Sequence, residues 1–350
     1  MTQATVSLRQ MTPADGEAVV RLAQLSPDSG NIQISPHYHL DAYQATLALH
    51  PDTIGVVAEQ EANGEVVGSA FVSFGSAFYE GIERQSATLH NLLVHPEHRR
   101  RGIATRLAHW RIECARQRIG SDGIITALIQ EGNTGSFAVS ESWRRETAGE
   151  AKRGAVQLRS KPPGTVSGMR VREARPSDLP IVAEGLNSFY EGYNLYPPQT
   201  AEKLTTWLEQ TPFAEPLRHY YVVEDGRGTL LAGLAVVEEH RLTEMRVQHL
   251  PLSLRLLNKF VKLVPPDGRL RQLSASRIWF KPDQLLAARY LWESVRWLWR
   301  ERGNTLTFAY DTRSPLSAIF RPPFWMPHTT FTYAVQGPVA VTPERLLFTG

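Results

Sequence analysis

The amino-acid sequence predicts a two-domain α/β protein. At 350 residues the chain is longer than one ordinary domain. Segments of strand character alternate with amphipathic helices in both halves. A proline- and glycine-rich linker at residues 162–168 separates the halves, and the pattern Arg-x-x-x-Pro-x-Asp occurs once on each side of it. We therefore expect tandem copies of one α/β unit, an N-terminal domain of residues 1–161 and a C-terminal domain of residues 169–350.

The first half contains strands and helices in regular alternation. The predicted order is a strand at residues 6–9, a helix opened by Thr12 and Pro13, a loop at 25–40, a helix at 41–49, strands at 54–59, 65–75 and 86–94, a helix from Gly102, a strand at 124–129, a helix at 134–143 and a closing strand at 154–158. Asn63-Gly64 is typical of a tight turn, which predicts a hairpin between the strands beside it.

The most informative segment runs from Leu89 to Leu107. Its apolar strand stops at Pro96, three arginines follow at residues 99–101, and a helix begins at Gly102. The first turn of a helix presents unpaired backbone N–H groups and partial positive charge, so it attracts anions. Small residues at this turn allow a phosphate to approach the backbone closely. The segment therefore predicts a pyrophosphate-binding turn.

The residues Val94-His95-Pro96, followed by Arg99-x-x-Gly102-x-Ala104, resemble the acetyl-CoA signature of the GNAT (GCN5-related) N-acetyltransferases. The resemblance covers the whole strand, turn and helix. It implies two tandem GNAT-like domains, each with a mixed α/β sheet, and acetyl-CoA (coenzyme A) as co-substrate. The implied coenzyme contacts are Leu92, Leu93, Val94, Arg99, Arg100, Arg101, Gly102, Ile103, Ala104, Thr105 and Asn133.

The resemblance also implies where the chemistry takes place. The strand of residues 89–94 should splay from the strand of residues 124–129, with the thioester carbonyl in the gap. A backbone N–H near Leu93 would polarise that carbonyl. In the resembled family a tyrosine seven residues after the equivalent of Asn133 often protonates the leaving thiolate. Ser140 stands at that position here, and a serine is a poorer and shorter acid.

Transfer to an amine requires that the attacking nitrogen be neutral, so a group must accept a proton. His90 is the first candidate base, because alternation from Val94 predicts residues 90, 92 and 94 on one face and histidine titrates in the useful range. Glu131 is the second candidate. A chain of water molecules, or one of Tyr38, His39 and Glu80, remains open as an alternative, and so does a purely structural histidine at position 90.

The second half departs from the first at the coenzyme turn. Counted from Pro96 and Pro282, Leu285 and Ala288 stand where Arg99 and Gly102 stand in the first copy. We therefore predict that the second copy does not bind acyl-CoA. Tryptophans near its long helix, predicted over residues 284–302, have the spacing of core residues rather than of a base-stacking surface. An inserted stretch at residues 241–272 includes a predicted amphipathic helix at 252–264.

Composition and charge exclude several classes of protein. A net charge of +3 is too small to indicate nucleic-acid binding, and no long uncharged apolar span or signal peptide occurs. We expect a cytoplasmic protein that binds neither nucleic acid nor membrane; a homodimer stays open. The single cysteine, Cys114, is interpreted as a core residue, and Pro96 disturbs the turn that His95 and His98 would need for chelation, so no metal is predicted.

These observations lead to one hypothesis and two alternatives. The hypothesis is an N-acetyltransferase whose N-terminal domain transfers an acetyl group from acetyl-CoA to a primary amine by direct attack. The second copy would form part of the acceptor site or stabilise the first. The alternatives are a non-enzymatic acyl-CoA sensor or scaffold, and an acyltransferase with a larger acyl donor. The acceptor, a small molecule or a peptide amine, cannot be identified from sequence because loops set its specificity.

Overall fold

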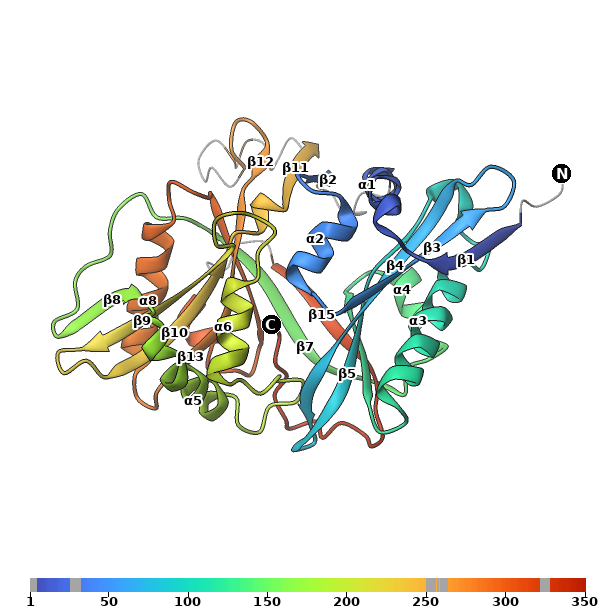
Figure 1. Ribbon diagram of the computed structural model, residues 1–350. Helices are drawn as coiled ribbons and strands as arrows, with labels where there is room; N and C mark the ends of the chain where they lie inside the picture. The colour runs from blue at the N-terminus through green and yellow to red at the C-terminus, as the bar shows by residue number, and fades with distance from the viewer. Residues whose placement is uncertain (1–4, 26–32, 250–255, 257, 259–263, 322–327) are drawn as a thin grey trace. The chain divides into compact units, whose positions relative to one another are not determined.

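The chain forms two compact units in the computed structural model, which describes residues 5–25, 33–249, 256, 258, 264–321 and 328–350. Unit 1 comprises Met1–Gly149, Met245–Val261 and Phe331–Pro343. Unit 2 comprises Glu150–Glu244, Lys262–Thr330 and Glu344–Gly350. Each unit contains both strands and helices (Figure 1).

Unit 1 is organised around a mixed sheet. Its strands lie in the order β1 (Val6–Gln10), β3 (Thr53–Gln60), β4 (Val66–Tyr79), β5 (Ile82–Val94), β6 (Ile124–Gln130) and β15 (His328–Gln336). The pairing is antiparallel except between β5 and β6, which run parallel. The predicted hairpin is confirmed, but its loop spans residues 61–64 between the paired residues Gln60 and Glu65, with Gly64 at positive φ.

Helices cover both faces of this sheet (Figure 1). On one face lie α1 (Gly16–Leu25), which follows the 3₁₀ turn η1 (Pro13–Asp15), and α2 (Ala42–Leu49); on the other lie α3 (Ile103–Ile119) and α4 (Thr134–Glu141). Phe71 packs with Met11 and Val19 in the first layer, and Leu89 packs with Ile112 in the second. The sheet is therefore buried on two sides, and β5 contributes side chains to both.

Unit 2 repeats this plan. Its strands lie in the order β7 (Glu146–Gln157), β14 (Thr305–Asp311), β13 (Gln272–Phe280), β10 (Leu230–Val237), β9 (Arg218–Asp225) and β8 (Met169–Glu173). Its helices are α5 (Leu179–Phe189), α6 (Ala201–Glu209), α8 (Leu285–Leu298) and α9 (Ser317–Phe320), with 3₁₀ turns η3 (Pro176–Asp178) and η4 (Glu239–Arg241). The remaining described strands are β2 (Gln33–Tyr38), β11 (Thr243–His249) and β12 (Arg269–Leu270).

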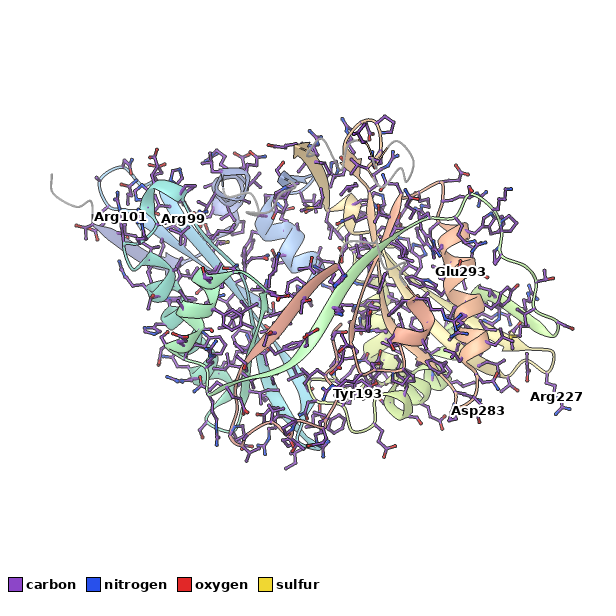
Figure 2. All side chains as sticks on the ribbon, turned by 180° about the vertical axis from the view of Figure 1, so that it is seen from behind. Arg99, Arg101, Tyr193, Arg227, Asp283 and Glu293 are labelled. Carbon is purple, nitrogen blue, oxygen red and sulfur yellow. The ribbon has the colours of Figure 1, made fainter. Side chains whose placement is uncertain are left out.

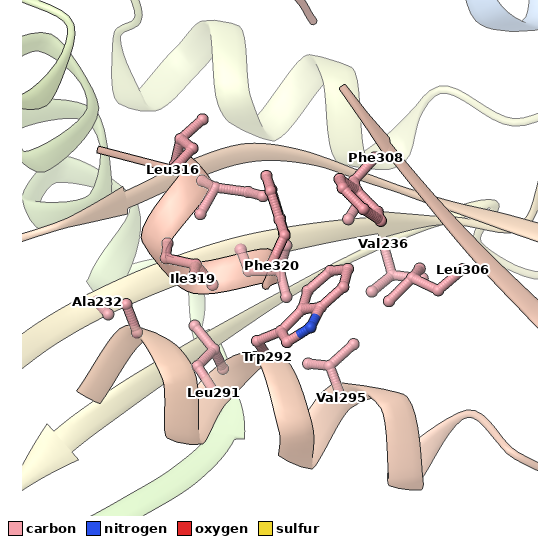
Figure 3. Close-up of a cluster of buried hydrophobic side chains, with 14 of the residues drawn as sticks. Ala232, Val236, Leu291, Trp292, Val295, Leu306, Phe308, Leu316, Ile319 and Phe320 are labelled. Carbon is pink, nitrogen blue, oxygen red and sulfur yellow. The ribbon is translucent and has the colours of Figure 1, made fainter. Parts of the chain in front are cut away.

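Three of the four tryptophans predicted to be core residues, at positions 279, 292 and 299, are buried; the fourth, Trp297, is only partly buried. Trp292 is 1% exposed and packs among Leu291, Val295 and Phe320 (Figure 3). Trp279 and Trp299 are also buried. Burial of aromatic surface of this size is a major contribution to the stability of unit 2.

An ion-pair network explains the sequence repeat. In unit 1, Arg9 donates two hydrogen bonds to Asp15 and one to Glu59. In unit 2, Arg172 bonds to Asp178 and Glu224 in the same way. Each arginine thus ties the first strand of its unit to the turn before the first helix. The repeated residues are structural in both copies.

The two units exchange strands, which the sequence did not predict. The strand expected to close the N-terminal domain pairs through residues 151–157 with β14 in unit 2. The free edge of β6 is covered instead by β15, through residues 331–336. Beyond β15, the Tyr79 hydroxyl donates a 2.8 Å hydrogen bond to the Val339 carbonyl within unit 1. Strand periodicity shows which face a residue occupies but not which edge a strand will join.

Two expectations fall partly or wholly on residues that the structure does not describe. The expected loop at 25–40 contains β2, and residues 26–32 lie outside the described part. The predicted helix at 252–264 lies outside the described residues except for isolated positions. Among the described helices, none is both long and apolar enough to cross a membrane.

Candidate functional site

The parallel strands β5 and β6 stop pairing halfway along their length. Their register runs only from Ser86 with Ile124 to Leu89 with Ala127. Strand β5 nevertheless continues to Val94. Strand β6 remains paired with its other neighbour, β15, as far as its last residue, Gln130. Residues 90–94 thus have no pairing with β6, which is the splay that the family resemblance implies.

A β-bulge lies where the splay begins. Phe71 of β4 is opposite His90, but Ser69 is opposite Leu93, so β5 contains one extra residue. Asn91 accommodates it with a φ of +51° and is exposed. Left-handed backbone at a residue other than glycine is uncommon and is frequent at functional sites.

The bulge overturns the expectation that residues 90, 92 and 94 share one face. Leu92 and Val94 pack against the layer that contains Ile103 and Leu107 of α3. The His90 ring instead stacks on Phe71, which belongs to the layer beneath α1 and α2. The extra residue reverses the alternation of side chains, and simple period-two counting cannot detect it.

A buried arginine supports the bulge from the side of α3. Arg111 is 3% exposed, and its Nη1 donates hydrogen bonds of 3.1 Å to the Phe71 carbonyl and 3.2 Å to the His90 carbonyl. Burial lowers its pKa to about 9. Sequence reasoning missed this residue. The pattern that could have identified it is its spacing: Arg111 lies four residues after Leu107, which places a charged residue on the apolar face of the helix.

The side chain of His90 is held by a chain of hydroxyl groups. Its Nε2 lies 2.6 Å from the Ser73 hydroxyl, which lies 2.7 Å from the Thr53 hydroxyl. Thr53 donates its only hydroxyl proton to the His50 carbonyl, so Ser73 must donate to Thr53 and His90 must donate to Ser73. This chain assigns the neutral ring the Nε2–H tautomer and leaves Nδ1 as an acceptor.

The surroundings of His90 keep its ring uncharged. Burial lowers the pKa of His90 to about 3, with smaller electrostatic contributions from His50 and Arg111. A group of that pKa does not retain a proton taken from an ammonium ion at neutral pH. In this state of the site, His90 is better suited to orient an amine through Nδ1 than to take its proton.

The predicted coenzyme turn lies between β5 and α3. The 3₁₀ turn η2 (Pro96–His98) is followed by three exposed arginines, of which Arg99 donates a 3.3 Å hydrogen bond from Nε to the Val94 carbonyl. Figure 2 shows Arg99 and Arg101 together at one end of unit 1. Arg100 has a φ of +60° and Gly102 a φ of +75°, so the backbone turns sharply before the helix begins.

Open space lies directly over the helix terminus. Gly102 is the N-cap of α3, and a Cβ added to it would meet no atom within 4 Å. The first hydrogen bond within the helix runs from the Arg106 amide to the Gly102 carbonyl. The amides of residues 103–105 therefore have no partner within the helix and can bind an anion. These residues fit the diphosphate of coenzyme A, which needs close backbone approach and nearby cations.

The other predicted site residues lie around α4. Asn133 is its N-cap, and its Oδ1 accepts a 3.0 Å hydrogen bond from the Ser136 amide. Glu131 is exposed just beyond β6. Ser140 is 1% exposed; it donates a 2.7 Å hydrogen bond to the Phe137 carbonyl and accepts one from Arg144. Because its single proton is committed to Phe137, Ser140 is poorly suited to protonate a thiolate.

No group of three or more metal-binding side chains comes together in the part of the chain that the structure describes. His37 and His39 contact each other edge to face, and so do His95 and His98. Cys114 is a partly buried free thiol on α3, and burial raises its pKa.

The second copy lacks the coenzyme turn. Residues 281–284 connect β13 to α8, a connection half as long as residues 95–102 in the first copy. Leu285 and Ala288, which replace Arg99 and Gly102 in the proline alignment, both lie within α8. There is no room in so short a connection for the series of arginines that surrounds the terminus of α3.

Comparison with known proteins identifies the fold of this site. Residues 20–145 match the model of the acetyltransferase (GNAT) family. This segment contains the splay, the bulge and the arginine turn. By sequence, no curated protein matches the chain.

Solved structures resemble the chain over nearly its whole length at low identity. N-myristoyltransferase from Saccharomyces cerevisiae with bound myristoyl-CoA has a TM-score of 0.66 at 11% identity, covering 98% of this chain and 85% of that one. A GCN5-related N-acetyltransferase from Sphaerobacter thermophilus has a TM-score of 0.63 at 15% identity, covering 97% and 98%. A tandem GNAT protein of clavulanic acid biosynthesis has a TM-score of 0.61 at 14% identity, covering 96% and 100%. The tandem GNAT fold is thereby confirmed.

Proposed function

Residues 20–145 carry a domain of the acetyltransferase (GNAT) family, and on this premise we propose that unit 1 transfers an acyl group from acyl-CoA to a primary amine. The observation that supports the proposal most directly is the turn at residues 99–104. It combines exposed arginines, a left-handed glycine and uncapped amides beside a strand that has separated from its neighbour. We further propose acetyl-CoA as the donor.

In the proposed complex the coenzyme diphosphate would bind the amides after Gly102, with Arg99, Arg100 and Arg101 as cations around it. The pantetheine arm would run along residues 92–94, which β6 leaves unpaired. A backbone N–H near Leu93 would donate to the thioester oxygen as negative charge develops there.

The reaction would be a direct attack of nitrogen on the thioester carbon. A carbon–nitrogen bond forms, the carbon–sulfur bond breaks, and the thiolate leaves. Since the pKa of His90 is about 3, the acceptor should enter as the free amine, with the lone pair of His90 Nδ1 available to orient one of its N–H bonds. The surplus proton would then leave to solvent or to the thiolate.

Two alternatives share the same coenzyme site. The donor could carry a longer acyl chain, and the fold likeness to an N-myristoyltransferase gives this alternative a specific basis. The protein could also bind acyl-CoA without transferring the acyl group, which the committed hydroxyl of Ser140 and the low pKa of His90 favour.

The coenzyme site is tested by a matched pair of substitutions at the two ends of α3. Gly102 and Gly120 both have φ near +70°, and an added Cβ meets nothing within 4 Å at either. Both Gly102→Glu and Gly120→Glu introduce one carboxylate at a positive φ; the strain is greater at the control position, because ψ is −172° at Gly120 and 0° at Gly102. Calorimetric titration with CoA should show at least a hundredfold weaker binding for Gly102→Glu and unchanged binding for Gly120→Glu. Equal binding by the two variants would refute the site.

The reaction is tested separately by release of CoA thiol from acetyl-, octanoyl- and myristoyl-CoA with a panel of amines. Turnover with acetyl-CoA supports the leading proposal, and turnover only with a longer donor supports the second. Binding without thiol release for every donor and amine would support the sensor.

A further inference from the structure

Unit 2 carries a bulge at the position equivalent to Asn91, but an arginine occupies it. Ala235 of β10 is opposite Ser276, whereas Gly233 is opposite Trp279, so β13 also contains one extra residue. Arg277 adopts a φ of +48° there, five residues before Pro282, just as Asn91 stands five residues before Pro96. The backbone of the splayed strand is thus repeated, while the side chain at the bulge has changed from an exposed amide to a partly buried cation.

Aromatic groups surround this arginine. The guanidinium carbon lies 3.7 Å from the centre of the Trp207 ring, which belongs to α6. Tyr220 donates a 2.8 Å hydrogen bond to the backbone carbonyl of Arg277, and Tyr190 and Tyr196 lie close enough to influence its charge. Burial holds the pKa of Tyr190 and Tyr220 well above the ordinary value, so these hydroxyls are neutral and provide no counter-charge.

No anion of unit 2 balances the charge of Arg277 within the described residues. Its Nε is enclosed without a hydrogen-bond partner. Its pKa is lowered to about 10, first by burial and then by Arg218, a second cation whose guanidinium carbon lies 5.1 Å from the same Trp207 ring. Arg218 differs in that one of its nitrogens donates to the Gln210 carbonyl. Two cations therefore flank one aromatic ring without a carboxylate beside Arg277.

A structural role accounts poorly for this arrangement. Arg111 is a buried arginine with a structural role in the same chain, and its guanidinium donates hydrogen bonds to two carbonyl oxygens at the bulge of β5. The guanidinium of Arg277 donates to no described residue. Burying a charged group without a counter-ion or a hydrogen-bond acceptor is costly, and an apolar side chain would pack on the Trp207 ring without that cost.

We propose that Arg277 and the ring of Trp207 form a binding site in unit 2 for a small organic carboxylate. The two terminal nitrogens of the guanidinium would donate parallel hydrogen bonds to the carboxylate, and the ring of Trp207 would contact the apolar body of the ligand. A carboxylate fits better than a phosphate monoester, because a phosphate dianion requires more donors than one fork supplies. This site is independent of acyl transfer in unit 1.

The proposal is tested on the full chain with benzoate as the probe and its neutral analogue benzamide as the matched ligand control. Binding is measured by calorimetry and by the shift in thermal midpoint. Benzoate should bind and raise the midpoint, and benzamide should bind at least tenfold more weakly. Inorganic phosphate is tested in parallel. If benzoate and benzamide give equal effects, or if phosphate alone binds, the carboxylate assignment is overturned.

The variants are Arg277→Met and Arg277→Lys, with Arg227→Met as control. Arg227 is an exposed arginine of the same unit, at the turn between β9 and β10 (Figure 2). Arg277→Met should abolish benzoate binding while the ligand-free protein keeps or gains thermal stability, because an uncompensated charge is removed. Arg277→Lys should weaken binding at least tenfold through loss of the fork, and Arg227→Met should change nothing. Undiminished benzoate binding by Arg277→Lys would refute bidentate recognition, whether or not Arg277→Met folds.

Discussion

Nη1 of Arg111 donates a 3.2 Å hydrogen bond to the carbonyl oxygen of His90, the residue just before the bulge in β5. The same nitrogen binds the Phe71 carbonyl on the neighbouring strand. A bulge leaves backbone groups without ladder partners, and buried carbonyls need donors. The arginine therefore stabilises the backbone geometry on which the proposed acyl-transfer site depends.

We expect Arg111→Met to destabilise the protein by about 2 kcal/mol, because two buried carbonyls lose their donor while one buried charge is removed. Urea unfolding measures the change. Arg106→Met, which removes an exposed arginine from the same helix, is the control and should lie within about 0.5 kcal/mol of wild type. Equal stability of the two variants would contradict a supporting role for Arg111.

The hydroxyl chain predicts the protonation state of His90. Its ring should remain the neutral Nε2–H tautomer from pH 5 to 8, because its pKa is about 3 and Ser73 accepts its proton. Nitrogen-15 NMR of labelled histidine measures this state. The Nδ1 resonance should have the chemical shift of a nitrogen without a proton, and it should not change between pH 5 and 8. Ser73→Ala should permit the other tautomer. An Nδ1–H signal in the wild-type protein would contradict the assignment.

Acid stability should depend on the carboxylate of Asp15. Hydrogen bonds from Arg9 hold the pKa of Asp15 at about 2, below its ordinary value of 3.8. A depressed pKa contributes stability that is complete above pH 3.8 and is lost as the pH falls toward 2. Asp15→Asn should therefore lower the free energy of unfolding by about 1 kcal/mol near neutral pH. This value is smaller than the pKa shift alone would give, because Arg9 is 42% exposed and solvent screens the ion pair. The difference should disappear at pH 2, whereas the exposed Glu17→Gln should have no effect at either pH.

Alkaline stability should depend on His219. Burial opposes its charge, but the hydrogen bond with Glu173 and the ion pair with Glu238, 3.4 Å from Nε2, outweigh burial and raise the pKa of His219 to about 9. A raised pKa contributes stability that is complete below pH 6.5 and is lost as the pH rises through 9. The wild-type protein should lose about 1 to 2 kcal/mol over this range, allowing for the exposure of Glu173. The free energy of unfolding of His219→Gln should not change over this pH range. If the variant loses as much stability as the wild-type protein, His219 is not the cause of the loss.

Local patterns predicted the elements of the site well, and contacts between distant residues were missed. The arginine turn and the helix after Gly102 were predicted because a phosphate-binding turn depends on residues that are adjacent in the sequence. The bulge at Asn91 was not, since an extra residue in a strand has no fixed sequence signal. The hydroxyl partners of His90 come from β3 and β4, and their proximity exists only in the folded sheet. The exchanged strands were missed for the same reason.

The exchange of β7 and β15 has a consequence for synthesis on the ribosome. The edge of β6 must wait for residues 331–336, which are translated about 200 residues after β6 itself. Until then, a nascent polypeptide exposes the unpaired edge of β6, the type of surface that chaperones bind and that aggregates form on. Translation of residues 331–336 therefore limits when unit 1 can complete its sheet.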